Sequence, residues 1–202
     1  MEIIRLTGGN TKKAVALAVG VLRAGGIVAY PTETFYGLGC RFDCEAALKR
    51  LYRLKGRPPE KAMPLIAGKK TLRMVAKDIN ELSRGLMARF WPGPLTLLLT
   101  AKEGLSRRLV KRGKVAVRTP GESFALRLAK KEAFPITATS ANPSGMPPAK
   151  TAKKVVEYFG GHIDLLIDGG KTPGGLPSTV ADATGKKAKI LRQGAIRIRP
   201  CS

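Results

Sequence analysis

The chain has 202 residues, of which 44% are hydrophobic, so it can form a globular domain and is neither a disordered tail nor a fibrous repeat. It contains no apolar run of the roughly 18 residues that a membrane span needs, and residues 1–7 lack the order of a signal peptide, which predicts a cytoplasmic protein without membrane contact. The 37 Lys and Arg against 14 Asp and Glu give a net charge of +23, which favours nucleic acid or nucleotides as partners over a merely solvated basic surface.

The first part of the chain predicts a helix, a strand, a polar turn and a second helix. Thr11 can cap a helix that Gly25-Gly26 is expected to end. A strand at Ile27 to Tyr30 leads into residues 31–40, whose hydroxyls and glycines favour a turn that contacts a ligand. The next helix is predicted at about Glu45 to Leu54.

The rest of the chain mixes strands and helices without strict alternation. After a strand near Pro64 to Ala67 we expect two helices, the second ending at Trp91-Pro-Gly-Pro94. Further strands are predicted at Leu95 to Thr100, Val115 to Thr119, Ile136 to Thr139, Leu165 to Asp168, Thr179 to Asp182 and Ile190 to Arg192, with helices near Ser123 to Glu132 and Thr151 to Phe159. This order predicts a single α/β domain over residues 1–202, with a twisted mixed β-sheet flanked by helices.

Several familiar sites are absent from the sequence. Gly170-Lys171-Thr172 fails as a Walker A motif because Leu165 stands where its first glycine should be. The only histidine, His162, lies among residues typical of a loop, which disfavours a catalytic triad. The three cysteines are too few for a disulfide framework or a zinc site, so free thiols are expected at Cys40, Cys44 and Cys201.

Four groups of polar residues at strand ends and turns are suited to a nucleotide and a small amino acid. Lys55 and Arg57 lie two residues apart in a turn, where both cations can reach one polyphosphate or, alternatively, complement the helix dipole. Residues 137–145 follow an apolar strand, and their small side chains would allow a ligand to approach the backbone, although the same string is also typical of a capped turn. The remaining groups are Pro177-Ser178-Thr179 and the strand-end arginines Arg118 and Arg192.

Seven motifs in order resemble the YrdC-like family and span about residues 27–194. They are Pro31-Thr-Glu-Thr-Phe-Tyr-Gly-Leu38, Lys55-Gly-Arg-Pro58, Trp91-Pro-Gly-Pro-Leu-Thr96, Val117-Arg-Thr-Pro120, Thr139-Ser-Ala-Asn142 with Ser144-Gly145, Pro177-Ser-Thr-Val180 and Leu191-Arg-Gln-Gly194. Seven ordered matches are far more specific than any one of them. The chain resembles the short form of the family, without the additional C-terminal domain of the long form.

The resemblance implies an open, positively charged concave face that binds ATP and L-threonine. The implied activity joins L-threonine, bicarbonate or CO2 and ATP into threonylcarbamoyl-AMP with release of pyrophosphate, for modification of tRNA by a downstream threonylcarbamoyltransferase complex. The implied threonine-binding residues are Thr34, Arg118, Thr139 and Ser178, and the implied nucleotide-binding residues are Lys55, Arg57, Ser140, Ala141, Asn142 and Arg192. Lys55 and Arg57 would also be catalytic, and Asn142 would contact Mg2+.

The sequence departs from the family pattern at one position, and two other functions stay open. Some members carry a histidine after the Pro-Leu of this segment, whereas here Pro64-Leu65 leads to Ile66, so threonine contacts there must differ. The first alternative is a non-enzymatic module that binds double-stranded RNA or tRNA, or a ribosome maturation factor; the 5% aromatic content and the hydroxyl-rich turns argue against it. The second is a carbamoyl-transfer module of the kind found in hydrogenase maturation proteins.

Overall fold

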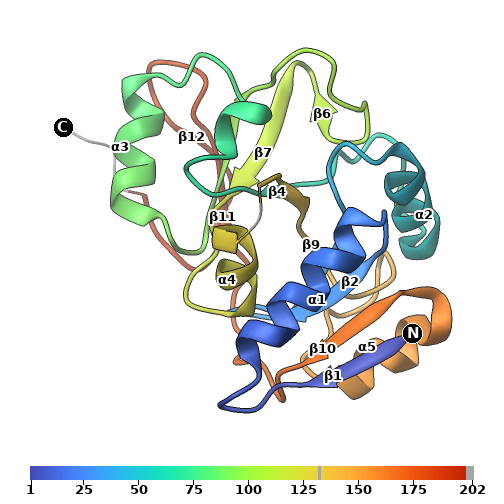
Figure 1. The fold of residues 1–202 in the computed structure, drawn as a ribbon. Helices are drawn as coiled ribbons and strands as arrows, with labels where there is room; N and C mark the ends of the chain where they lie inside the picture. Colours follow the sequence, from blue (N-terminus) through green and yellow to red (C-terminus); the bar gives the residue numbers. More distant parts are fainter. Residues whose placement is uncertain (132, 199–202) are drawn as a thin grey trace.

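The computed structural model describes residues 1–131 and 133–198, which form two mixed β-sheets with helices packed against them (Figure 1). The predictions for Glu132 and Cys201 therefore lie outside the described residues. In Figure 1 the first sheet lies toward the lower right and the second toward the top and left. No helix among the described residues has the length and apolar character needed to cross a membrane.

The first sheet contains five strands in the order β1 (Glu2–Arg5), β10 (Leu165–Asp168), β2 (Val28–Pro31), β3 (Tyr36–Gly39) and β9 (Thr139–Ser140). β1, β10 and β2 are parallel, whereas β3 runs antiparallel to β2 and to β9. The helices α1 (Thr11–Arg23) and α4 (Phe124–Lys131) pack against β2, and α5 (Ala152–Phe159) packs against β10. The strands β2 and β3 are buried along their whole length, which makes their hairpin a rigid support for its polar tip.

The second sheet has the order β12 (Lys189–Arg192), β11 (Thr179–Asp182), β5 (Leu95–Thr100), β7 (Lys114–Arg118), β4 (Leu65–Ile66) and β8 (Ile136–Thr137). β6 (Val110–Lys111) pairs with β7, and α3 (Glu81–Phe90) packs against β5. The strand pairs β11–β5 and β4–β7 are parallel and the other pairs are antiparallel. The remaining α-helix of the described chain, α2 (Glu45–Lys55), precedes the loop that leads to β4.

The segment 136–140 joins the two sheets. Its β8 half pairs with β4 of the second sheet, and after Ala138 its β9 half pairs with β3 of the first. The hydroxyl of Tyr30, from β2, donates to the carbonyl oxygen of Thr137 at 3.1 Å. A Cβ atom at Gly37 or Gly39 would lie 2.9 Å from the Tyr30 ring, so these two glycines let the ring lie flat beneath the hairpin.

Most of the predicted elements are confirmed, including the α/β class, and the strands are divided between two mixed sheets. One predicted helix is wrong: between β4 and α3 the structure has only a 3₁₀ turn at Leu72–Met74. The polar turn expected at 31–40 is the tip and second strand of the β2–β3 hairpin. Two short strands, β1 and β6, have no counterpart in the sequence-based prediction.

Candidate functional site

A cavity of about 350 Å³ lies where the two sheets meet. Its walls come from the β2–β3 hairpin and β9 of the first sheet and from β4, β5, β7, β11 and β12 of the second. Seven of the ten predicted site residues line it: Thr34, Arg57, Arg118, Thr139, Ser140, Ser178 and Arg192. Predicted site residues that are up to 158 positions apart, from Thr34 to Arg192, thus share one cavity.

The hairpin tip presents hydroxyl groups to this cavity. The Thr32 hydroxyl donates to the carbonyl oxygen of Phe35 at 2.7 Å and accepts hydrogen bonds from the backbone N–H groups of Thr34 and Phe35. The Thr34 hydroxyl lies 3.3 Å from that of Thr32. This is a local side-chain-to-backbone turn of the kind that Thr favours, and it fixes Thr34 at the cavity wall.

Arg118, at the end of β7, forms an ion pair with Glu33 at the hairpin tip, across the gap between the sheets. Its Nη2 donates to Glu33 Oε1, and the two side chains are only 12% and 18% exposed. Arg118 Nε and Glu33 Oε2 are buried and have no hydrogen-bond partner. The guanidinium is therefore fixed through one nitrogen, and its buried Nε has no hydrogen-bond partner.

Arg192 and Ser178 form a second polar group on the opposite wall. Arg192 Nη2 donates to the Ser178 carbonyl oxygen at 2.8 Å, and the Ser178 hydroxyl lies 2.9 Å from the buried hydroxyl of Thr96. Burial and the charge of nearby Arg118 lower the pKa of Arg192 from its ordinary value. The guanidinium groups of Arg118 and Arg192 thus line the same cavity and repel each other. An anion bound between them would stabilise this arrangement.

Lys55 lies behind the cavity wall, and its ammonium points into the protein. The residue is 3% exposed, and its Nζ donates to the carbonyl oxygens of Ser140, at 2.5 Å, and of Asn142. Burial, and to a smaller degree the charge of Arg57, lowers the pKa of Lys55 to about 7. Lys55 therefore holds the loop after β9, and its predicted contact with the triphosphate stays a prediction.

Arg57 forms the boundary of the cavity next to α2. Its Nε and Nη2 each donate at 2.8 Å to a backbone carbonyl, those of Lys61 and Ala62. Ala141, by contrast, is fully buried, and its N–H donates to the Tyr36 carbonyl oxygen at 2.7 Å. Any contact of Ala141 with a nucleotide would have to go through backbone atoms.

Asn142 adjoins the cavity without lining it. Its Nδ2 donates to the carbonyl oxygens of Pro143, at 2.9 Å, and Met146, at 2.7 Å, which fixes the orientation of the amide. Its Oδ1 is buried without a hydrogen-bond partner, which is the type of neutral oxygen that Mg2+ accepts. The described residues contain no group of three or more His, Cys, Asp or Glu that could hold a metal, so phosphate oxygens would have to complete such a site.

The structure adds residues that reasoning from the sequence did not assign to the site. Glu33 pairs with Arg118, Thr32 organises the hairpin tip, and Thr96 contacts Ser178. All three lie inside the motifs quoted above, which were the only signal in the sequence. The partners of Glu33 and Thr96 are distant in sequence, so local patterns could not assign them. Pro64 and Ile66 line the cavity and give an apolar wall at the position where the sequence departs from the family pattern.

The cavity suits a small ligand that carries anionic and polar groups. Three guanidinium groups, from Arg57, Arg118 and Arg192, line it together with several hydroxyls, and no carboxylate is among its lining residues. Guanidinium groups can donate two parallel hydrogen bonds to a carboxylate or a phosphate. The described chain thus provides anchors for two anionic groups within a single cavity.

Comparison with known proteins gives concordant matches. The family model Sua5_yciO_yrdC, described as telomere recombination, matches residues 20–194. The chain is 43% identical over 185 residues to a threonylcarbamoyl-AMP synthase of Pyrococcus abyssi, covering 90% of this chain and 54% of that protein. It is 42% identical over 174 residues to a threonylcarbamoyl-AMP synthase of Thiobacillus denitrificans, covering 85% of this chain and 90% of that protein.

The fold agrees with that of a solved relative. The structure of P. abyssi Sua5 complexed with L-threonine superimposes with a TM-score of 0.86 at 41% identity, over 96% of this chain and 57% of that one. The chain therefore spans about half the length of the first curated relatives that it matches.

Proposed function

Because the chain belongs to the Sua5/YciO/YrdC family, we propose that it is a threonylcarbamoyl-AMP synthase, which joins L-threonine, bicarbonate or CO2 and ATP and releases pyrophosphate. The product would be passed to a transferase complex that modifies tRNA. Bound L-threonine in a solved relative supports the choice of amino acid. The observation that carries the proposal is the shared cavity, because only a common site can bring a carbamate oxygen to the α-phosphorus of ATP.

The amino acid is proposed to bind between the hairpin tip and β7. The guanidinium of Arg118, which lines the cavity, would donate to the substrate carboxylate, while Glu33 keeps it in place through Nη2. The hydroxyls of Thr34 and Thr139 would contact the hydroxyl and the amine of threonine. The apolar wall at Ile66 would accept the threonine methyl group.

The nucleotide is proposed to bind on the side of Arg57 and Arg192. Their guanidinium groups would contact the phosphates, and the loop after β9, which Lys55 holds by its carbonyls, would shape the wall beside them. Mg2+ would contact Asn142 Oδ1 and phosphate oxygens and would neutralise part of the phosphate charge.

The reaction then needs positioning and charge stabilisation more than proton transfer. The threonine nitrogen bonds to the carbon of CO2 to give a carbamate, the nitrogen loses a proton, and a carbamate oxygen bonds to the α-phosphorus as the bond to pyrophosphate breaks. Negative charge grows on the leaving pyrophosphate, where Arg57 and Arg192 would stabilise it. This division of labour agrees with a chain that has a single histidine, His162, outside the cavity lining.

A pyrophosphate-release assay tests the proposal. The purified chain is incubated with ATP, Mg2+, bicarbonate and each of a panel of amino acids. We expect release that depends on threonine and exceeds that with serine, which lacks the methyl group, and with valine, which lacks the hydroxyl. Release that is absent, or equal for all amino acids, would rule out the proposed activity.

A further inference from the structure

The strand β12 carries Arg192 as its last residue, where regular strand pairing is weakest. Within the described chain β12 is an edge strand of the second sheet, pairs with β11 alone and has all four of its residues exposed. The last pair, Val180 with Arg192, adjoins a register shift between Val180 and Ala181. Exposed ends of an element fray readily, so this pairing alone does not fix the direction of a guanidinium that lines the candidate cavity.

A buried hydroxyl group fastens the chain just beyond this strand end. Thr179 is fully buried, and its hydroxyl donates to the carbonyl oxygen of Ile196 at 2.6 Å. The same hydroxyl oxygen accepts hydrogen bonds from the N–H groups of Gly194, at 3.0 Å, and Ile196, at 3.3 Å. A hydroxyl has one donor position and two acceptor positions. All three positions of this hydroxyl are therefore used by the backbone that follows Arg192.

The two segments also touch through their backbones. The N–H of Ala195 donates to the carbonyl oxygen of Pro177 at 3.0 Å. A Cβ atom at Gly194 would lie 2.5 Å from the carbonyl carbon of Ser178 and 2.6 Å from the nitrogen of Thr179. Only glycine allows this approach without displacing the backbone. We call residues 177–179 and 194–196, with these contacts, the clasp.

The clasp carries both polar groups on this wall of the cavity. Ser178 lies inside one of its segments, and Arg192 lies two residues before the other. The three hydrogen bonds of the Arg192 side chain within the described residues all go to Ser178, two to its carbonyl oxygen and one to its hydroxyl. The guanidinium therefore takes its direction from a residue whose two neighbours, Pro177 and Thr179, are bonded in the clasp.

Thr179 is not among the residues that line the cavity, so it can act there only through Ser178 and Arg192. A buried threonine that merely satisfies nearby backbone groups has a different pattern, which Thr71 illustrates. Thr71 is 4% exposed, and its hydroxyl bonds within its own turn, to the N–H and the carbonyl oxygen of Gly68. The hydroxyl of Thr179 instead joins residues that are 15 and 17 positions apart.

We propose that Thr179 is a positioning residue, whose hydroxyl closes the clasp and so fixes Arg192 and Ser178 in the direction that a bound phosphate group needs. A phosphate of the nucleotide as the ligand of Arg192 is part of the proposed function, on which this role of Thr179 rests. Donors that are fixed before binding lose less conformational freedom when the ligand binds. Opening the clasp therefore weakens phosphate binding without removing any group that touches the ligand.

Isothermal calorimetry with inorganic tripolyphosphate tests this role without any need for turnover. Thr179→Val removes the hydroxyl at nearly constant volume, and we expect it to weaken tripolyphosphate binding about tenfold, because two side chains are no longer fixed. Thr179→Ser keeps the hydroxyl and should bind within about twofold of the wild type. Thr71→Val, the matched control, loses a similarly buried hydroxyl and should bind as the wild type does.

A double-mutant cycle shows whether the hydroxyl acts through the guanidinium. In an Arg192→Gln background, Thr179→Val should weaken tripolyphosphate binding further by only about twofold or less, because the positioned group is already gone. An undiminished tenfold loss in that background would overturn the proposal, since the hydroxyl would then act on binding elsewhere.

Gln193→Ala is the second variant, for the case that Thr179→Val does not fold. The amide of Gln193 donates to the carbonyl oxygens of Ile196, at 2.7 Å, and Gly194, at 3.2 Å. Its removal loosens the same segment and leaves the Thr179 hydroxyl in place. We expect tripolyphosphate binding to be about threefold weaker, and wild-type affinity would in that case overturn the proposal.

Threonine-dependent pyrophosphate release, measured alongside, separates this role from the proposed function. Equal tripolyphosphate affinity in Thr179→Val and Thr71→Val would overturn the positioning role even where the wild type is an active synthase. A wild type without such release would contradict the proposed function, whereas a loss of affinity confined to Thr179→Val would still support a phosphate site held by Thr179. A wild type that does not bind tripolyphosphate would overturn the positioning role.

Discussion

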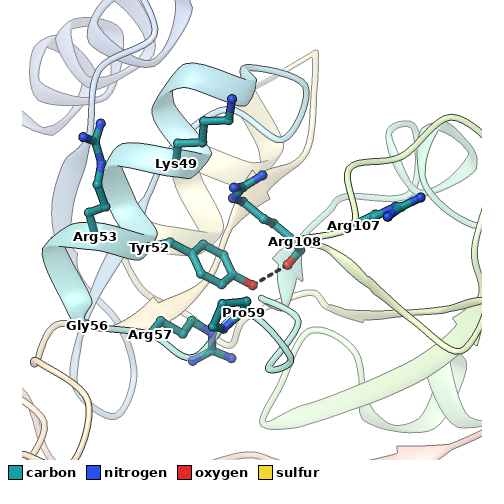
Figure 2. A pocket seen from close by; sticks show the side chains of 8 residues that line it. All are labelled: Lys49, Tyr52, Arg53, Gly56, Arg57, Pro59, Arg107 and Arg108. Atoms are coloured by element: carbon teal, nitrogen blue, oxygen red, sulfur yellow. Dashed lines mark hydrogen bonds between the residues drawn. The ribbon is translucent and has the colours of Figure 1, made fainter.

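The candidate cavity and the hollow beside α2 hold positive charge in opposite ways. The hollow is lined by Lys49, Tyr52, Arg53, Gly56, Arg57, Pro59, Arg107 and Arg108 (Figure 2). In the cavity, Arg118 is paired with a carboxylate and Arg192 with a backbone carbonyl, so each guanidinium has a fixed direction. In the hollow beside α2, Lys49, Arg53 and Arg107 are exposed and without partners among the described residues. Fixed donors favour a ligand of defined geometry, because less side-chain freedom is lost when the ligand binds. The difference indicates that the cavity, and not the hollow, holds its cations in the directions that a defined ligand needs, although the two share Arg57.

The sharpest way to break this comparison is to remove the shared residue. Arg57→Ala should lower threonine-dependent pyrophosphate release by about 100-fold or more, because a fixed charge at developing negative charge is worth that much. Steady-state kinetics measure the effect, with Arg23→Ala, which alters an exposed arginine of α1, as the control. Full pyrophosphate release would remove Arg57 from the nucleotide site.

The next largest effect concerns the amino-acid side of the cavity. Arg118→Ala should raise the KM for threonine by about 10- to 150-fold, which corresponds to the loss of a charge-assisted hydrogen bond worth ~1.5 to 3 kcal/mol. Arg127→Ala, which alters an exposed arginine of α4, is the matched control. A KM for threonine that equals the wild-type value would exclude Arg118 from the threonine site.

The role of Glu33 sharpens the contrast between fixed and free cations. Glu33→Gln replaces a charged partner of Arg118 by a neutral one, so the KM for threonine should rise only about fivefold, or ~1 kcal/mol. Glu33→Gln should have no additional effect in the Arg118→Ala background if the carboxylate acts only through that guanidinium. Additive effects in this double-mutant cycle would show that Glu33 contacts the substrate itself.

The smallest effect is a proton taken up when ATP binds. Lys55 has a pKa of about 7, below its ordinary value, so at pH 8 it is mostly neutral, and nearby phosphate charge should raise this pKa. ATP binding at pH 8 should therefore take up a fraction of a proton, measured by calorimetry in buffers of different ionisation enthalpy. Lys55→Met should abolish the uptake, and heats that do not depend on the buffer in the wild type would contradict it.

The lowered pKa of Lys55 also predicts how the free energy of unfolding depends on pH. The unfolded chain binds the Lys55 proton more tightly than the folded chain does, because the folded pKa is the lower one. The contribution of Lys55 to the free energy of unfolding should therefore increase as pH rises from about 7 toward the ordinary range of lysine, and it is lost as pH falls through 7. Chemical denaturation of wild type and Lys55→Met across this range measures the difference.

The sequence allowed prediction of most elements and of which strand ends carry polar groups. The strands at Leu165–Asp168 and Thr179–Asp182 were predicted with their observed bounds, because apolar runs are bounded there by turn residues. Where the structure has only the 3₁₀ turn at Leu72–Met74, the sequence predicts a helix, since local patterns do not show where a helix fails to continue. The division into two sheets depends on long-range pairing, which local patterns do not report.

The direction of side chains was harder to predict than their position. Seven predicted residues line the cavity, but Lys55 does not, because its buried ammonium donates to the carbonyl oxygens of Ser140 and Asn142. The ion pair of Arg118 with Glu33 joins residues 85 positions apart, a contact that single-sequence patterns cannot reveal. The hollow beside α2 likewise combines that helix with residues 107 and 108, and the strands β4 and β5 lie between them in the sequence.

The identity of the product tests the central claim most directly. The purified chain is incubated with ATP, Mg2+, L-threonine and ¹³C-labelled bicarbonate, and the adenylate is analysed by mass spectrometry. If threonine and ATP react within one cavity as proposed, the adenylate contains both threonine and the labelled carbon. An adenylate that contains threonine without the label, or the absence of any threonine-containing adenylate, would contradict the account.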